Sequence, residues 1–163
     1  MGLLGPHIRR FNDASADVQV LPWEIDQVVS IRGAWNCPAS FDDDAGVRLD
    51  VMAALLDKGT ASKSKIEIAE QLERIGASIS FSARGSRIHV SARCLAGDLS
   101  VVSGLIREQL IEPAFPDREL ELLKGRLKAQ IVRQQSDPGA VCRNWISRIV
   151  YPLGHPSREL DLQ

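Results

Sequence analysis

One stretch of this sequence is expected to form a buried helix that ends in a glycine stop and a turn, and it carries few side chains that could do chemistry. Between Gly46 and Thr60, apolar side chains are spread around most of the helical circumference, which is typical of a helix covered on nearly every side. One stripe has no bulky side chain, and it follows the spacing i, i+3, i+4, i+7: Asp50, Ala53, Ala54 and Asp57. This stripe faces either tight packing or a cavity.

Two other stretches contain residues that can bind a metal or move a proton. The consecutive aspartates 42–44 could hold calcium, but the other positions of an EF-hand loop are absent, which favours a solvated loop before the helix. His89 could act as a general base. No carboxylate or nucleophile stands at a suggestive spacing from it, so an exposed strand histidine is the simpler interpretation.

A third stretch, over 116–135, is rich in basic residues and could line a nucleic-acid groove. Its basic side chains are Lys124, Arg126, Lys128 and Arg133. Only Trp145 supplies an aromatic ring nearby, and no recognition motif accompanies the basic residues, which favours a solvated helix face. We therefore expect no nucleic-acid partner.

The composition indicates one globular domain over residues 1–163. The formal net charge is −1 and the pI about 6.3, so no global field favours a polyanion or an anionic membrane. Cys37, Cys94 and Cys142 have neither disulfide-framework nor zinc-finger spacing, and we interpret them as small apolar residues. No apolar run is long enough for a membrane span. The N-terminus is not a convincing signal peptide, although a fragment could have lost one, which leaves cytoplasm and periplasm open.

The hydrophobic periodicity predicts an α+β fold with a largely antiparallel sheet and helices packed on one face. The order is strand, strand, helix, helix, strand, strand, helix, helix, helix. The expected strands cover 18–21, 28–35, 78–82 and 87–94. The expected helices cover 46–57, 64–75, 98–111, 116–135 and 138–150. Ser64 and Glu67 have the capping-box spacing, Asp98 is a good N-cap residue, and Leu127 and Ile131 belong to the expected buried stripe of the long helix.

Several short motifs, in this order, resemble one family. They are Lys58-Gly59-Thr60, Ser64-x-x-Glu67, Asp98-Leu99, Pro113-x-Phe115 and Gly154-His155-Pro156. In order and spacing they are similar to the amino-terminal part of a domain in the pitrilysin/insulinase family of zinc peptidases, which includes the mitochondrial processing peptidases. The resemblance covers 18–156. Because a family domain continues beyond this point, we expect the domain to be incomplete at its C-terminus.

Active members of that family carry an inverted zinc motif, His-x-x-Glu-His, on the helix before Lys-Gly-Thr. The resemblance places its three functional positions on Asp50, Ala53 and Ala54. A shift by one residue would place them on Leu49, Met52 and Ala53. The family's third zinc ligand, a glutamate on the later long helix, corresponds to Gln130, with Ala129 as the other candidate. The resemblance thus implies no catalytic residue, no metal ligand and no cofactor in this chain.

The family also suggests a role for a chain without the metal. Its peptidases resemble clamshells of two related halves or subunits, of which often only one binds zinc. The expected function is that of a non-catalytic half, which completes a peptide-binding chamber for a homologous catalytic partner and an extended peptide substrate, in an oligomer. The alternatives are a structural or assembly protein of the same fold with no role in proteolysis, and an enzyme that recruits its ligands elsewhere.

Overall fold

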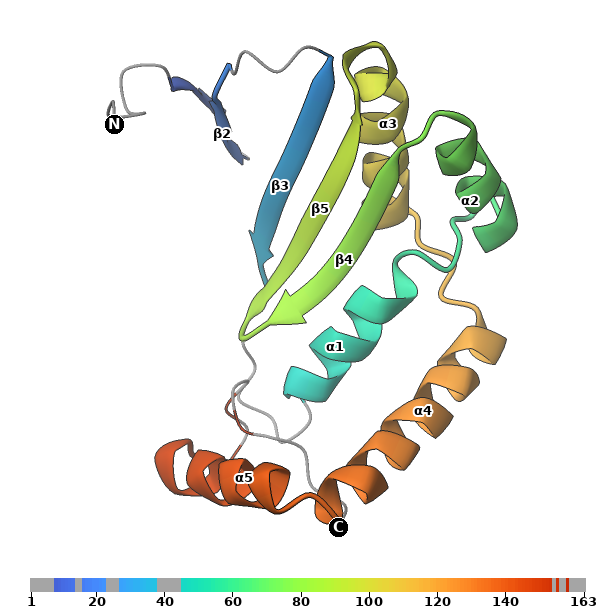
Figure 1. The fold of residues 1–163 in the computed structure, drawn as a ribbon. Coiled ribbons are helices and arrows are strands. Elements are labelled where there is room, and N and C mark those ends of the chain that lie inside the picture. The colour runs from blue at the N-terminus through green and yellow to red at the C-terminus, as the bar shows by residue number, and fades with distance from the viewer. Residues whose placement is uncertain are drawn as a thin grey trace.

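The computed structural model describes residues 8–13, 16–22, 27–37, 45–153, 155 and 158. The strands are β1 (Arg9–Asp13), β2 (Ala16–Val20), β3 (Val28–Asn36), β4 (Ser78–Arg84) and β5 (Arg87–Leu95). The α-helices are α1 (Ala45–Leu55), α2 (Lys65–Arg74), α3 (Leu99–Ile111), α4 (Asp117–Gln135) and α5 (Pro138–Val150). A short 3-10 turn, Ala96–Asp98, precedes α3. This order confirms the predicted α+β class (Figure 1).

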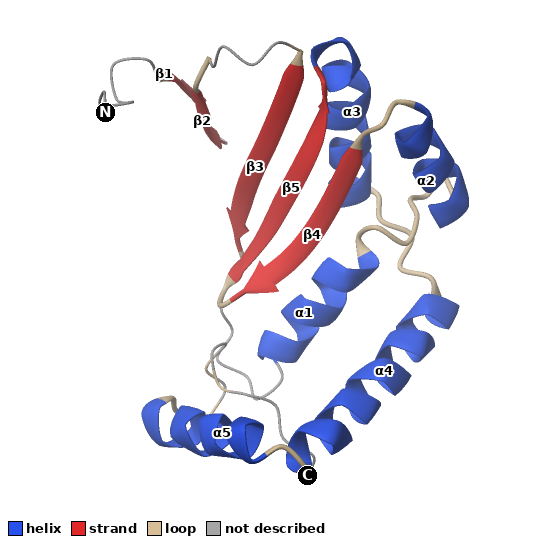
Figure 2. Ribbon diagram, viewed as in Figure 1, coloured by secondary structure: helices blue, strands red, loops and turns tan. Residues whose placement is uncertain are grey.

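The main sheet has three antiparallel strands in the order β3-β5-β4, and α1 and α3 contact it, whereas α4 and α5 lie farther out (Figure 2). Central β5 pairs with both neighbours, so that Ala92 lies between Ile31 and Ile79. One face of β5 packs against α3 in a core formed by Val90, Ala92, Cys94, Val102 and Ile106. The alternation of apolar and polar residues along the strands therefore did predict the buried face.

The hairpin between β4 and β5 is confirmed. Its tight turn contains Gly85, whose φ of +59° lies in the left-handed region that favours glycine. Along β5 the residues on the core side are buried, whereas Arg87, Ser91 and Arg93 on the other side are exposed and His89 is half-buried. The sheet thus has one apolar and one polar face.

The N-terminal strands differ from the prediction. The strand expected over 18–21 is β2, and it pairs with an unexpected strand, β1, in a separate two-stranded sheet. The sequence of β1 has no alternation of apolar and polar residues, and Phe11 is 58% exposed. Its strand conformation comes from backbone pairing with β2 and not from burial, so hydrophobic pattern does not reveal it.

The helix ends were predicted with mixed success. The capping box of α2 is present, with the Ser64 hydroxyl accepting from the Glu67 backbone and the Glu67 carboxylate accepting from the Ser64 backbone. Gly76, with a φ of +59°, follows the helix as expected. Asp98 is the N-cap residue of α3 as expected, but its side chain makes no capping hydrogen bond, and a 3-10 turn leads into the helix.

The long helix α4 is less covered than predicted. The stripe expected to be buried is only half-buried along its length: Leu120, Leu123, Leu127 and Ile131. The reason is that α4 lies outside α1 and does not touch the main core cluster. No helix in the described part of the chain is both long and apolar enough to cross a membrane.

Candidate functional site

Helix α1 lies between β4 and α4 (Figure 1). It carries the positions that the sequence resemblance matches to the zinc motif. Asp50 is exposed, Ala53 is only 2% exposed, and Ala54 is half-buried. The prediction that α1 is covered on nearly every side was too strong, because Arg48 and Asp50 are exposed and most of its other described residues are only half-buried. At Ala53 the stripe is tightly packed.

The carboxylates of the stripe have different surroundings. Partial burial raises the pKa of Asp50 above its ordinary value, since desolvation disfavours the charged form. Asp57, just beyond the end of α1, forms an ion pair with Lys58 at 2.6 Å between Oδ1 and Nζ. Of the two carboxylates in the stripe, only Asp50 therefore lies within α1.

The fourth position, Gln130, lies on α4. This helix runs antiparallel to α1 and contacts it (Figure 1). Gln130 and the other candidate, Ala129, are both exposed, whereas Ile131 next to them is half-buried. The fold thus brings the two predicted motif helices side by side. The assignment of Asp50, Ala53, Ala54 and Gln130 to the former ligand and base positions stays a prediction.

These residues do not fit a zinc ion. Catalytic zinc takes three protein ligands from histidine, cysteine, aspartate and glutamate, and the alanine methyl groups have no lone pair to donate. Within the residues that the structure describes, no group of three or more such side chains could hold a metal. The stripe offers the carboxylates of Asp50 and Asp57, of which Asp57 is paired with Lys58, and a tightly packed methyl group at Ala53.

The turn between α1 and α2 is held by its backbone. Gly59 has a φ of +128°, and a Cβ there would lie 3.1 Å from the Lys63 carbonyl oxygen, so a side chain would be strained. The Thr60 amide donates to the Lys63 carbonyl at 2.8 Å, and the Ala114 amide donates to the Gly59 carbonyl at 3.1 Å. The second bond ties the end of α1 to the segment that leads into α4.

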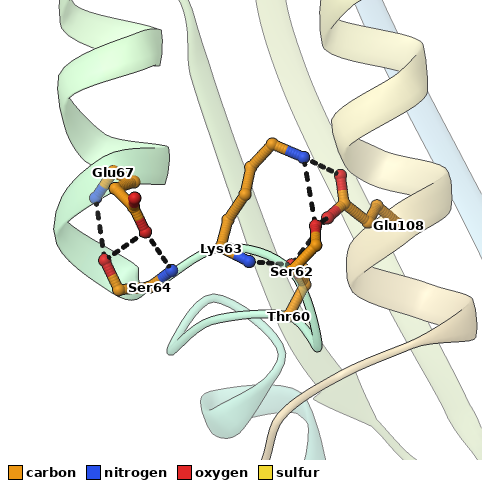
Figure 3. A network of polar contacts seen from close by, with 6 residues as sticks. All are labelled: Thr60, Ser62, Lys63, Ser64, Glu67 and Glu108. Carbon is orange, nitrogen blue, oxygen red and sulfur yellow. Dashed lines mark hydrogen bonds and ion pairs between the residues drawn. The ribbon is translucent and has the colours of Figure 1, made fainter.

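A partly buried polar network locks the same turn to α3, and we call it the Glu108 clamp: Thr60, Ser62, Lys63 and Glu108 (Figure 3). The Thr60 hydroxyl, on a residue only 5% exposed, accepts from the Lys63 amide at 3.0 Å and donates to Glu108 Oε1 at 2.7 Å. Lys63 Nζ lies 2.5 Å from Glu108 Oε2, and the Ser62 hydroxyl also donates to Oε1. The Lys-Gly-Thr motif therefore has a structural role that needs no metal.

The clamp lowers the pKa of Glu108 from its ordinary value of 4.5 to about 2. The largest cause is the hydrogen bond from Lys63, followed by those from Ser62 and Thr60. Hydrogen bonds to the ionised form favour that form. Sequence pattern could not identify Glu108 because its partners lie 45 to 48 residues away along the chain.

We expect Glu108→Gln to lower the free energy of unfolding at pH 7 by on the order of 1–2 kcal/mol, because the amide keeps the shape but loses the charge. A carboxylate whose pKa is lowered on folding stabilises the folded state at pH values above its unfolded pKa. This stabilisation is lost as the pH falls from the unfolded value of 4.5 through the folded value of about 2. Urea unfolding should show the gap between variant and parent shrinking over that range. The control is Glu70→Gln, at an exposed site on α2. A gap as large at pH 3 as at pH 7 would contradict the clamp.

Among the described residues, no catalytic partner lies beside the remaining candidates. His89 pairs across the sheet with Ala34 and Ser82. Cys94 is a buried core residue, as predicted, and burial raises the pKa of its thiol. Cys142 is exposed, and its interpretation as a small apolar residue stays a prediction. The aspartates 42–44 and residues 154 and 156 lie outside the described residues.

Known structures share this fold. A peptidase M16 inactive domain from Pseudomonas fluorescens superposes with a TM-score of 0.81 and 23% identity over 94% of this chain. A conserved protein from Enterococcus faecalis gives a TM-score of 0.74 and 13% identity over 93% of it. The ferredoxin protease FusC, as a mutant in complex with Arabidopsis ferredoxin, gives 0.71 and 15% over 99%.

This chain covers only part of each of these structures, namely 38%, 40% and 18% of their lengths. No protein-family model matches the sequence, and no curated protein matches it significantly. At these identities the likeness establishes the fold, which is that of a peptidase M16 inactive domain, and does not establish an activity.

Proposed function

We propose that this chain is a non-catalytic half or subunit of a zinc peptidase of the insulinase and processing-peptidase type. One observation carries the proposal. Helix α1, its Lys-Gly-Thr turn and α2 belong to a fold shared with a peptidase inactive domain. In this proposal the metal motif would stand at Asp50, Ala53 and Ala54, none of which is a histidine or a glutamate. A zinc ligand set is absent from this stretch although its supporting frame is intact.

In this proposal the metal and the reaction belong to a homologous partner. The chain would close the peptide-binding chamber, with the stripe on α1 as part of its wall. Zinc in the partner would polarise the scissile carbonyl and activate a water molecule. The present residues contribute shape: Ala53 is tightly packed, and Ala54 beside it carries only a methyl group.

Purification of the tagged chain from its native host tests the proposal. We expect a homologous partner with His-x-x-Glu-His, about one zinc ion per complex, and peptide hydrolysis that chelation abolishes. Substitution of the partner's motif glutamate by glutamine should abolish hydrolysis, whereas Asp50→Asn in this chain should leave it within about twofold, because Asp50 is not assigned a chemical role.

Two results would overturn the proposal. The first is stoichiometric zinc in the isolated chain together with peptide hydrolysis that depends on it, which would make the chain an enzyme in its own right. The second is a stable complex whose members lack the motif and hydrolyse no peptide. That result would support the alternative, a structural or assembly protein of the same fold.

A further inference from the structure

The polar face of the main sheet concentrates positive charge. Alternate residues of β3, β4 and β5 point away from the core, and all the described ones except His89 are exposed. The basic residues of this cationic sheet face are Arg32 on β3, Arg84 on β4, and Arg87, His89 and Arg93 on β5. The other positions between them are mostly serines, namely Ser30, Ser78, Ser80, Ser82 and Ser91.

The strand register sets these side chains in rows. Arg93 lies between Ser30 and Ser78, and Ser91 lies between Arg32 and Ser80. At the hairpin end, Arg87 lies between Asn36 and Arg84. Neighbouring strands lie about 4.8 Å apart and alternate residues of one strand about 6.6 Å apart, so the four arginines are spread over roughly 20 Å along the strands.

The charge of this face is not neutralised within the described chain. In that part of the protein no carboxylate forms an ion pair with Arg32, Arg84 or Arg93, and Arg87 Nε donates to the uncharged Asn36 Oδ1 at 2.8 Å. Arg84 directly opposes Arg87, and like charges opposite one another destabilise a sheet. With 20 basic and 21 acidic residues in the chain, composition does not force this arrangement.

We propose that the cationic sheet face binds an acidic segment of a polypeptide in extended conformation. An extended peptide repeats its side chains every two residues at about the spacing of the sheet rows, so alternate carboxylates can meet successive rows. Arginine donates two parallel hydrogen bonds to a carboxylate, and the short serine side chains leave the guanidinium groups accessible. The inference goes beyond the proposed function, because this binding needs neither zinc nor a catalytic partner.

A polypeptide fits the face better than a single-stranded nucleic acid does. Proteins that bind single strands stack bases on aromatic side chains, and the described positions of this face offer no aromatic residue besides His89. Trp35 belongs to the other face, where its ring lies against Gly33 at 3.4 Å from the position of a Cβ. The available chemistry is therefore that of carboxylate recognition.

Fluorescence anisotropy with the isolated full chain and a labelled oligoglutamate tests the proposed binding. The oligoglutamate has about eight residues, because the face spans roughly 20 Å along β5. We expect binding that weakens with salt. Replacing Arg32, Arg84, Arg87 and Arg93 together by glutamine should weaken it at least about tenfold. The matched control replaces four other exposed arginines by glutamine: Arg74, Arg107, Arg118 and Arg126. It removes the same charge and should change affinity within about twofold.

A second variant guards against misfolding of the first. Ser80→Glu with Ser91→Glu keeps every arginine but introduces carboxylates among them, and it should also abolish binding. Absence of binding by the wild type, or equal losses in the face variant and its control, would overturn the proposal. Tighter binding of a single-stranded oligonucleotide of equal charge through the same arginines would overturn the assignment to a polypeptide.

Discussion

Replacing Ile106 by alanine is expected to lower the free energy of unfolding by about 2–5 kcal/mol. Ile106 is 8% exposed and packs with Val90, Ala92 and Cys94 in the core between α3 and β5. The loss combines the transfer free energy of the removed methylene and methyl groups with the cost of the cavity, because the surrounding strands can collapse only in part. Urea unfolding followed by circular dichroism measures it.

The chain provides a matched series for this test. Ile111 ends the same helix and is 59% exposed, so Ile111→Ala should cost within about 0.5 kcal/mol. Ile131 on α4 is half-buried, and Ile131→Ala should fall between the two, at about 1–2 kcal/mol. A loss at Ile131 equal to that at Ile106 would show that α4 is covered in solution.

Restoring the metal ligands is expected to convert the stripe into a zinc site. Asp50→His with Ala54→His and Gln130→Glu supplies the three ligands that a catalytic zinc requires. If the alignment is right, this variant should bind zinc at least about 100-fold more tightly than the parent does, in competition with a chromogenic chelator. The register control is Leu49→His with Ala53→His and Gln130→Glu, which should bind more weakly.

The base position requires separate treatment. Ala53 is 2% exposed, so Ala53→Glu would bury an unpaired carboxylate and cost on the order of 3 kcal/mol. In the absence of zinc, we therefore expect the four-residue variant, which also carries Ala53→Glu, to be less stable than the three-ligand variant. Zinc should recover part of the loss. A folded three-ligand variant that takes up no zinc would contradict the assignment of Asp50, Ala54 and Gln130.

Local patterns predicted much of the fold because their physical causes are local. The hairpin of β4 and β5 follows from alternation and from a glycine at a left-handed turn position, and the start of α2 follows from two residues three apart, Ser64 and Glu67. Strand β1 escaped prediction because its pairing with β2 leaves no hydrophobic signature. The half-burial of α4 also escaped, because a periodic stripe shows which side is apolar but not how much of it is covered.

The candidate site was predictable only in part. The positions on α1 came from counting back along one helix, and α4 does lie beside that helix. The Glu108 clamp joins residues far apart in the sequence, and nothing in the local pattern of α3 distinguishes Glu108 from any solvated glutamate.

The clamp has a consequence for how such a chain can change over generations. Because Gly59, Thr60 and Glu108 hold the turn through hydrogen bonds of the protein itself, the end of α1 stays tied to α3 and to the segment before α4 without a metal. Substitutions at Asp50 or Gln130 can then accumulate without loss of the scaffold, since both side chains are exposed. Thr60 and the Ser64–Glu67 capping box therefore have structural roles that do not depend on which residues occupy positions 50 and 130.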